Sequence, residues 1–78
     1  MRFLHVDDAE YLHGYSVKLR FNDGFEGVVD LSDSLTGPVF EPLRDNAFFK
    51  SFRIEGNTLS WENGADFAPE YLKEKAQQ

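Results

Sequence analysis

The feature that most constrains the fold is a run of alternating side chains that ends in a turn signal. From Tyr15 to Phe21 every second side chain is apolar, and the side chains between them are polar. This period of two is typical of a β-strand with one buried face and one exposed face. Asn22-Asp23-Gly24 follows, and its glycine supplies the positive φ that a tight reversal needs. The sequence therefore predicts an antiparallel hairpin whose second strand covers residues 25–31.

Charge supports one register for this hairpin. Pairing Phe21 with Phe25 sets Arg20 opposite Glu26. An exposed cross-strand pair of opposite charge contributes about 0.2–1 kcal/mol, which is enough to favour a register without holding the fold together.

The amino-terminal segment is expected to form a weaker strand at a sheet edge. Its apolar residues lie within residues 3–7 and at Tyr11 and Leu12, and Asp8-Ala9-Glu10 is expected to interrupt the strand. Because an exposed edge strand pairs readily with another chain, a homodimer remains one expectation.

Residues 32–51 are expected to form short helical turns, because Pro38 and Pro42 interrupt the alternation and proline cannot donate to a β-ladder. Two single turns fit the apolar spacings of three and four, with Asp45 or Asn46 capping the second turn. The apolar residues of these turns are Val39, Phe40, Leu43, Phe48, Phe49 and Phe52.

A second hairpin is predicted over residues 52–61, with Gly56-Asn57 as a two-residue reversal. This register places Ile54 opposite Leu59 and Phe52 opposite Trp61. Pro69 is then expected to open a short carboxy-terminal helix, since proline at the first helical position loses no hydrogen bond. Together these elements predict a small α+β domain of antiparallel hairpins, short helical turns and one terminal helix.

Length and charge bound the function. The chain has 78 residues, a net charge of −6 and no cysteine. One domain covering residues 1–78 is therefore expected. Eight bases are scattered among fourteen acids, which opposes binding to nucleic acid or to an anionic membrane surface. The lack of cysteine excludes disulfides and thiolate metal sites and fits a reducing compartment, so the cytoplasm is the expected location. No apolar run approaches the roughly 20 residues that span a membrane.

A search for reactive groups favours structural interpretations. His5 and His13 lie near Asp7, Asp8 and Glu10, but their spacing is not that of a known metal site. No serine lies in a nucleophile motif, and the glycines are dispersed rather than gathered in a phosphate loop. Catalysis by a carboxylate pair would need two of the following acids close together: Asp30, Asp33, Glu62, Asp66 and Glu70. We therefore expect no enzymatic activity, no metal and no cofactor.

The segment from Trp61 to Leu72 is the most distinctive part of the sequence. Structurally it reads as a strand end, a glycine turn and a helix start. The functional hypothesis is that the four residues named next line one groove, in which an exposed tryptophan beside carboxylates favours a basic partner. These candidate binding residues are Trp61, Asn63, Asp66 and Glu70.

Several segments spread over nearly the whole chain form a recognisable combination: Gly14-Tyr15, Leu19–Gly24, Val29–Leu31, Pro42–Asp45, Phe49 and Trp61–Leu72. In these segments the chain resembles a bacterial family known as domain of unknown function 2442. The resemblance implies a small α+β domain without established catalytic activity. Some members carry a helix-turn-helix segment after this domain, and others resemble the antitoxin half of a gene pair whose partner is a small basic protein. Because the present sequence ends at Gln78, directly after the expected helix, we expect no DNA-reading unit here.

Two functional hypotheses lead from these observations. The first is a non-catalytic, antitoxin-like interaction module that binds a small basic protein through an acidic surface. The alternative is a ligand-sensing or accessory domain of a transcriptional regulator that acts without its own DNA-binding unit. A third hypothesis, an enzyme with its site in residues 61–70, requires a pocket that gathers two or more of Asp30, Asn63, Asp66 and Glu70.

Overall fold

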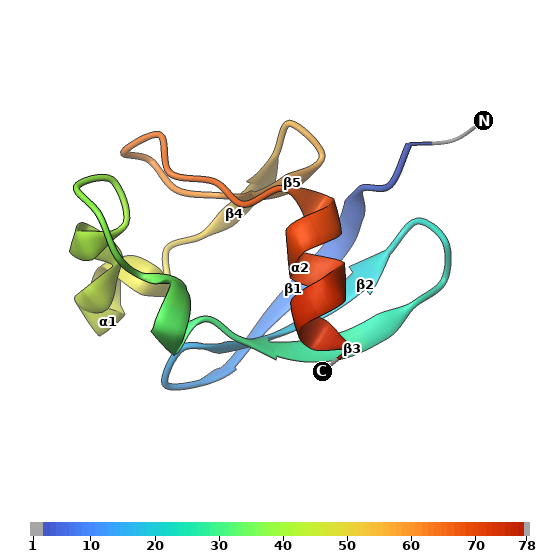
Figure 1. Ribbon diagram of the computed structural model, residues 1–78, viewed down its shortest axis with the longest axis horizontal. Coiled ribbons are helices and arrows are strands. Elements are labelled where there is room, and N and C mark those ends of the chain that lie inside the picture. Colours follow the sequence, from blue (N-terminus) through green and yellow to red (C-terminus); the bar gives the residue numbers. More distant parts are fainter. Residues whose placement is uncertain (1–2, 78) are drawn as a thin grey trace.

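The computed structural model describes residues 3–77 and has the predicted α+β architecture (Figure 1). Its elements in chain order are β1 (Val6–His13), β2 (Ser16–Phe21), β3 (Glu26–Asp30), tight 3-10 turns at Ser32–Ser34 and Glu41–Arg44, α1 (Asn46–Phe49), β4 (Arg53–Glu55), β5 (Thr58–Ser60) and α2 (Pro69–Ala76). Within the described residues, no helix is long and apolar enough to cross a membrane.

Strands β1, β2 and β3 form an antiparallel sheet in that order. The predicted register of the β2–β3 hairpin is confirmed, because Arg20 pairs with Glu26 and the Phe21 amide donates to the Phe25 carbonyl at 2.9 Å. The reversal between them has Gly24 at φ 90°, a conformation that favours glycine.

Strand β1 lies at the sheet edge, as predicted, but the predicted interruption at Asp8-Ala9-Glu10 is wrong. These three residues pair continuously with β2, and the register instead shifts between Val6 and Asp8 and between Tyr11 and His13. Bulges absorb extra residues without ending a strand, so acidic residues on an exposed face are compatible with continuous pairing.

The segment between the hairpins folds into three short turns rather than the two predicted. The extra turn is Ser32–Ser34, directly after the sheet. The Asp45 side chain caps α1 by accepting a hydrogen bond from the Ala47 amide at 3.2 Å, which confirms one of the two predicted caps. Leu43 and Phe49 are fully buried, so these turns contribute directly to the core.

The second hairpin has the predicted register, with Ile54 paired to Leu59. Gly56 and Asn57 both have positive φ, at 60° and 69°, which is the backbone of a type I′ turn and matches the twist of the flanking strands. Ser60, the last residue of β5, forms a bridge with Asp66, so the chain folds back along the side of β5 that faces away from β4.

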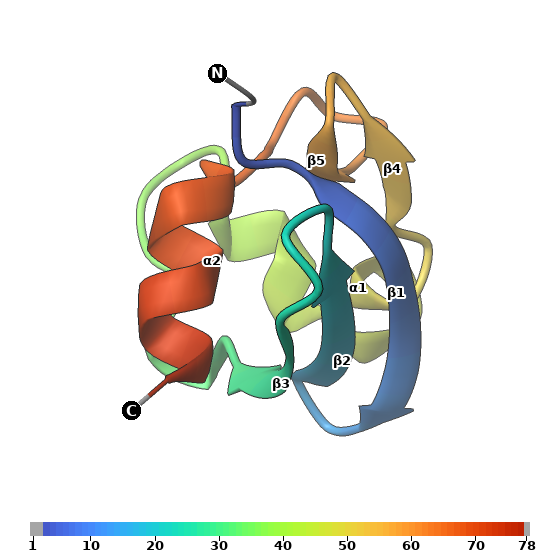
Figure 2. The same ribbon diagram turned by 90° about the vertical axis from the view of Figure 1, so that its right-hand side faces the viewer.

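One hydrophobic core joins these layers. It is built from side chains of both hairpins, the turns and the terminal helix: Val6, Val17, Leu19, Phe21, Val29, Leu31, Leu35, Leu43, Phe49, Leu59, Trp61, Ala65, Phe67 and Leu72. Helix α2 begins at Pro69, as predicted, and buries Leu72. Figure 2 shows α2 on one side of the molecule and β1 at the opposite margin.

Candidate functional site

An acidic hollow of about 330 Å³ lies beside the β4–β5 hairpin. It is lined by both ends of the hairpin and by the loop that follows β5: Arg53, Glu55, Gly56, Ser60, Trp61, Glu62, Gly64, Ala65 and Asp66. We call it the hairpin hollow.

Backbone hydrogen bonds of the loop after β5 shape this hollow. The Gly64 amide donates to the Trp61 carbonyl at 3.0 Å, and the Trp61 amide donates to the Ala65 carbonyl at 2.9 Å. The Asn63 side-chain oxygen accepts from the Ala65 amide at 3.1 Å. Gly64 adopts φ 91°, which side-chain-bearing residues rarely reach. The tight turn thereby brings Asp66 back beside Ser60.

The charges of the hollow are mainly negative. Glu55, Glu62 and Asp66 contribute carboxylates, and Arg53 contributes the single base among its lining residues. The Arg53 guanidinium forms an ion pair with Glu55. Glu62 and Asp66 are exposed to solvent. Because the Arg53–Glu55 pair leaves Glu62 and Asp66 as the unbalanced charges among the lining residues, the hollow has an excess of negative charge that attracts cationic groups.

Trp61 is a core residue, which contradicts the exposed tryptophan of the functional hypothesis and agrees with the structural interpretation of this segment. Its side chain is 2% exposed, and its indole nitrogen donates to the Phe49 carbonyl at 2.9 Å. The ring also packs edge-on against Phe52 and Phe67, at centroid distances of 6.3 and 5.8 Å. In a domain this small the largest apolar side chain is needed in the core. Trp61 therefore supports the wall of the hollow from behind and presents no aromatic face to a partner.

The structure brings only part of the predicted site together. Trp61 and Asp66 line the hollow, whereas Asn63 and Glu70 are not among its lining residues. The Asn63 amide group donates to the Val39 carbonyl at 2.9 Å and ties the loop to the preceding turns. Glu70 is exposed in the first turn of α2, where a carboxylate complements the helix dipole.

Sequence reasoning missed two acids of the hollow as binding candidates. Glu62 lies inside the distinctive 61–72 segment, so its position next to Trp61 was a usable signal. Glu55 comes from the preceding strand, and only the fold of the loop back onto the hairpin brings it near Asp66.

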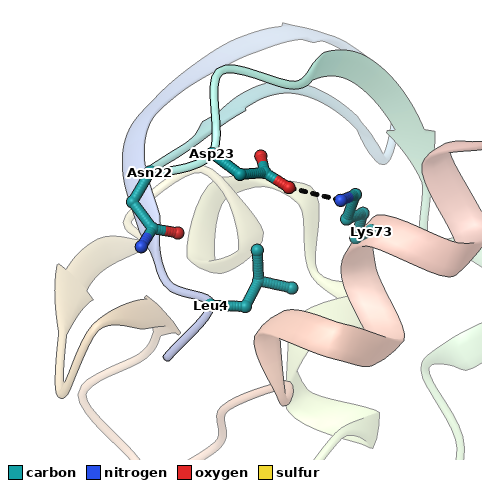
Figure 3. A pocket seen from close by; sticks show the side chains of 4 residues that line it. All are labelled: Leu4, Asn22, Asp23 and Lys73. Carbon is teal, nitrogen blue, oxygen red and sulfur yellow. Dashed lines mark hydrogen bonds and ion pairs between the residues drawn. The ribbon is translucent and has the colours of Figure 1, made fainter. Parts of the chain in front are cut away.

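A second hollow, of about 380 Å³, lies between the amino-terminal segment, the β2–β3 reversal and α2 (Figure 3). It is lined by Leu4, Asn22, Asp23 and Lys73. The Lys73 ammonium forms an ion pair with Asp23 and lies 5.5 Å from the centre of the Phe25 ring. The hydrogen bond from Lys73, followed by that from the Phe25 amide, lowers the pKa of Asp23 below its ordinary value.

The two histidines lie apart, at opposite ends of the β1 region. His5 contacts Asp7, with Nε2 and Oδ1 3.0 Å apart, and His13 ends β1. Among residues 3–77, no group of three or more His, Cys, Asp or Glu side chains is arranged to hold a metal ion. Asp30 lies outside both hollows, and its carboxylate accepts from the Ser32 amide at 2.9 Å, which lowers its pKa.

Comparison with protein families gives one finding. The family model described as "Protein of unknown function (DUF2442)" matches residues 6–78. Comparisons with curated proteins and with solved structures returned no match.

Proposed function

We propose that this chain, which belongs to the DUF2442 family of proteins of unknown function, is a non-catalytic interaction module that binds a small basic protein. The observation that carries the proposal is the hairpin hollow, whose lining includes three carboxylates and one guanidinium on a chain of net charge −6. Such a surface attracts a basic partner over a distance and orients it before contact.

The hollow offers specific contacts in addition to the long-range electrostatic attraction of its negative charge. Glu62 and Asp66 stand on a loop whose backbone is fixed by hydrogen bonds at both ends, so binding orders little additional chain. A lysine or arginine that enters between them would form charge-assisted hydrogen bonds, which are stronger than neutral ones.

The first experiment is a pull-down from a lysate of the source organism at low and high salt, read by mass spectrometry. A stoichiometric basic protein that is lost at high salt is the expected result, because added salt shortens the screening length of exposed charges from about 8–10 Å at physiological ionic strength to about 3 Å at 1 M. A partner retained equally at both salts contradicts an electrostatic interface.

Matched variants locate the interface. With the captured partner purified, Asp66→Asn and Glu62→Gln are expected to weaken binding by about tenfold each, the size of a lost charge-assisted contact. Glu70→Gln removes the same charge outside the hollow and is expected to change the affinity less. Equal losses for all three variants would mean that only net charge matters.

If the chain is an antitoxin, its partner must be toxic to the host cell. Expressed alone, the basic protein should slow growth of the host cell, and co-expression of this chain should restore growth. Restoration by the wild-type chain but not by the Glu62→Gln, Asp66→Asn double variant would connect neutralisation to the hairpin hollow. A partner that is harmless when expressed alone leaves an interaction module without antitoxin action.

A second candidate function, small-ligand sensing, is favoured by the hollow at Lys73. Its volume of about 380 Å³ falls within the range of small-molecule sites, and the Asp23–Lys73 pair matches a small zwitterion. A thermal-shift screen of amino acids tests it. A ligand present at 100 times its Kd stabilises the native state by about 2.7 kcal/mol, and this gain should disappear in Lys73→Met.

A further inference from the structure

The backbone hydrogen bonds of β2 are divided between its two neighbours. The Phe21 amide donates to Phe25, the residue just before β3, whereas the Asn22 amide donates to His5, the residue just before β1. In an antiparallel sheet, the backbone amide and carbonyl of successive residues in a central strand point alternately to one neighbouring strand and to the other. Odd-numbered residues of β2 therefore bond towards β3, and even-numbered residues bond towards β1.

This alternation determines which backbone groups of β1 point outward. Ala9 pairs with Leu19 and Tyr11 pairs with Val17. Because Leu19 and Val17 direct their amides and carbonyls to β3, the amides and carbonyls of Ala9 and Tyr11 point away from β2. They form an outward row at the sheet edge, which we call the β1 edge.

Another segment already uses the start of this edge. Val6 pairs with the odd-numbered Phe21, and its outward amide donates to the Asn57 carbonyl at 2.9 Å. Within residues 3–77 this is the one backbone hydrogen bond from β1 to a segment other than β2. Strands β4 and β5 lie close to β1, near one margin of the molecule (Figure 2). The stretch from Asp8 to Tyr11, between the two register shifts, is regular.

The exposed face of the sheet carries charges that alternate from strand to strand. Asp8 on β1 pairs with Arg20 on β2, and Arg20 pairs with Glu26 on β3. Glu10 on β1 likewise pairs with Lys18 on β2. Since opposite charges on adjacent strands stabilise a pairing and like charges oppose it, the strand that would continue this pattern beyond β1 carries bases.

We propose that the β1 edge from Asp8 to Tyr11 binds an extended segment of a basic protein as a fourth strand, with lysine or arginine opposite Asp8 and Glu10. This inference rests on the proposed function for the basic character of the partner, and it names a second surface, distinct from the hairpin hollow, together with the mode of binding. Main-chain hydrogen bonds to Ala9 and Tyr11 supply affinity, and the two acids select the partner.

A second copy of this chain fits the same edge poorly. Antiparallel pairing of two β1 strands about Ala9 sets Asp8 of each copy opposite Glu10 of the other, and like charges directly opposite are destabilising. The acids that would admit a basic strand therefore protect the edge against self-association.

The test uses the full chain and a capped peptide of alternating lysine and valine, with about the eight residues of β1. Amide hydrogen exchange is followed by NMR while peptide is added. At ten times the peptide Kd, exchange at Ala9 and Tyr11 is expected to slow by about tenfold, because only the free protein exchanges. Unchanged exchange at both amides under saturating peptide, or no binding at all, overturns the proposal.

Two controls separate strand addition from charge attraction. A peptide of the same charge with alternate backbone amides methylated should bind more weakly and give no protection at Ala9 and Tyr11. The double variant Asp8→Asn, Glu10→Gln should weaken binding of the unmodified peptide, whereas Glu41→Gln, Glu74→Gln, with the same loss of charge at exposed sites on other elements, should weaken it less.

The outcomes also distinguish the two proposals. Peptide-induced shifts confined to Glu62 and Asp66 would overturn the β1 edge and leave the hairpin hollow as the interface. Protection of Ala9 and Tyr11 in the protein alone, with the mass of a dimer, would show that a second copy occupies the edge and would overturn a basic partner there. A basic partner captured from lysate that leaves both amides unprotected preserves the proposed function alone.

Discussion

The two hairpins look alike in sequence but play different parts in the structure. In β2 the alternating apolar side chains are buried, and Leu19 is 0% exposed. In β4 all three residues are exposed, and Ile54 is 37% exposed although its partner Leu59 is fully buried. The first hairpin is therefore the centre of the core, whereas the second contributes one strand to the core and presents the other to solvent.

This difference separates the scaffold from the candidate binding surface. Strand β2 has a strand on each side, so its edges are satisfied, and its apolar face is buried in the core. Hairpin β4–β5 belongs to a two-stranded sheet, which is marginal by itself and depends on contacts such as that of Trp61 with Phe49. Its exposed strand consequently carries charged groups, Arg53 and Glu55, that face solvent.

The largest expected effect contrasts the two hairpins directly. Leu19→Ala should lower the free energy of unfolding by about 2–5 kcal/mol, because it leaves a cavity in a fully packed site. Ile54→Ala should cost less than about 1.5 kcal/mol, because part of that side chain already contacts water. Urea unfolding followed by circular dichroism measures both. Equal losses of unfolding free energy would contradict the distinction between a first hairpin that forms the core and a second hairpin that exposes β4 to solvent.

Trp61→Phe tests the attachment of the second hairpin. The substitution removes the indole donor and leaves the Phe49 carbonyl without its 2.9 Å partner, at a cost of about 1–3 kcal/mol. Denaturant unfolding measures the loss. If stability is unchanged, shape rather than this hydrogen bond holds the hairpin, and Trp61→Leu should then be the more damaging variant.

A smaller effect is expected at the reversal of the second hairpin. Gly56→Ala places a Cβ at φ 60° and should destabilise the protein by roughly 1–2 kcal/mol through backbone strain alone, since no atom lies within 4 Å of the added carbon. Thermal unfolding provides the readout. A neutral result would indicate that the turn rearranges freely, which would weaken the claim that the hollow is preorganised.

The smallest effect concerns the ion pair between Asp23, in the reversal of the first hairpin, and Lys73 of α2. The pKa of Asp23 is lowered chiefly by the hydrogen bond from Lys73. A carboxyl group whose pKa is lower in the folded state stabilises the protein above its unfolded pKa, and this contribution is lost as pH falls through the folded pKa. Stability should therefore decline below about pH 4, and Asp23→Asn should make this decline less steep.

Lys73→Met provides the matched control for that pH profile. It removes the main cause of the lowered pKa, so it should also flatten the acid side of the stability curve. Adding Asp23→Asn to Lys73→Met should then have little further effect, because both variants remove the same interaction. An additive double variant would show that the two residues act separately.

The sequence predicted local features well and the site only in part. Both hairpin registers and the helix start at Pro69 were predicted correctly, and Asp45 was confirmed as one of the two alternative caps, because each depends on residues close together in the chain. The break in β1 was predicted wrongly, since pairing with β2 outweighed the local preference of its acids. The candidate site was half assembled, because Asp66 and Trp61 reach the hollow and Asn63 and Glu70 do not line it.

The sequence by itself determined the α+β class, the positions of the two hairpin reversals and the acidic charge, because periodicity, glycine placement and charge can be read from the residues themselves. Only the tertiary structure decided that Trp61 is buried while Ile54 is exposed, and that Glu55 and Glu62 join Asp66 in one hollow. Burial and clustering depend on how distant segments pack against one another, and a side chain takes its place in the core according to the volume that those segments leave to be filled.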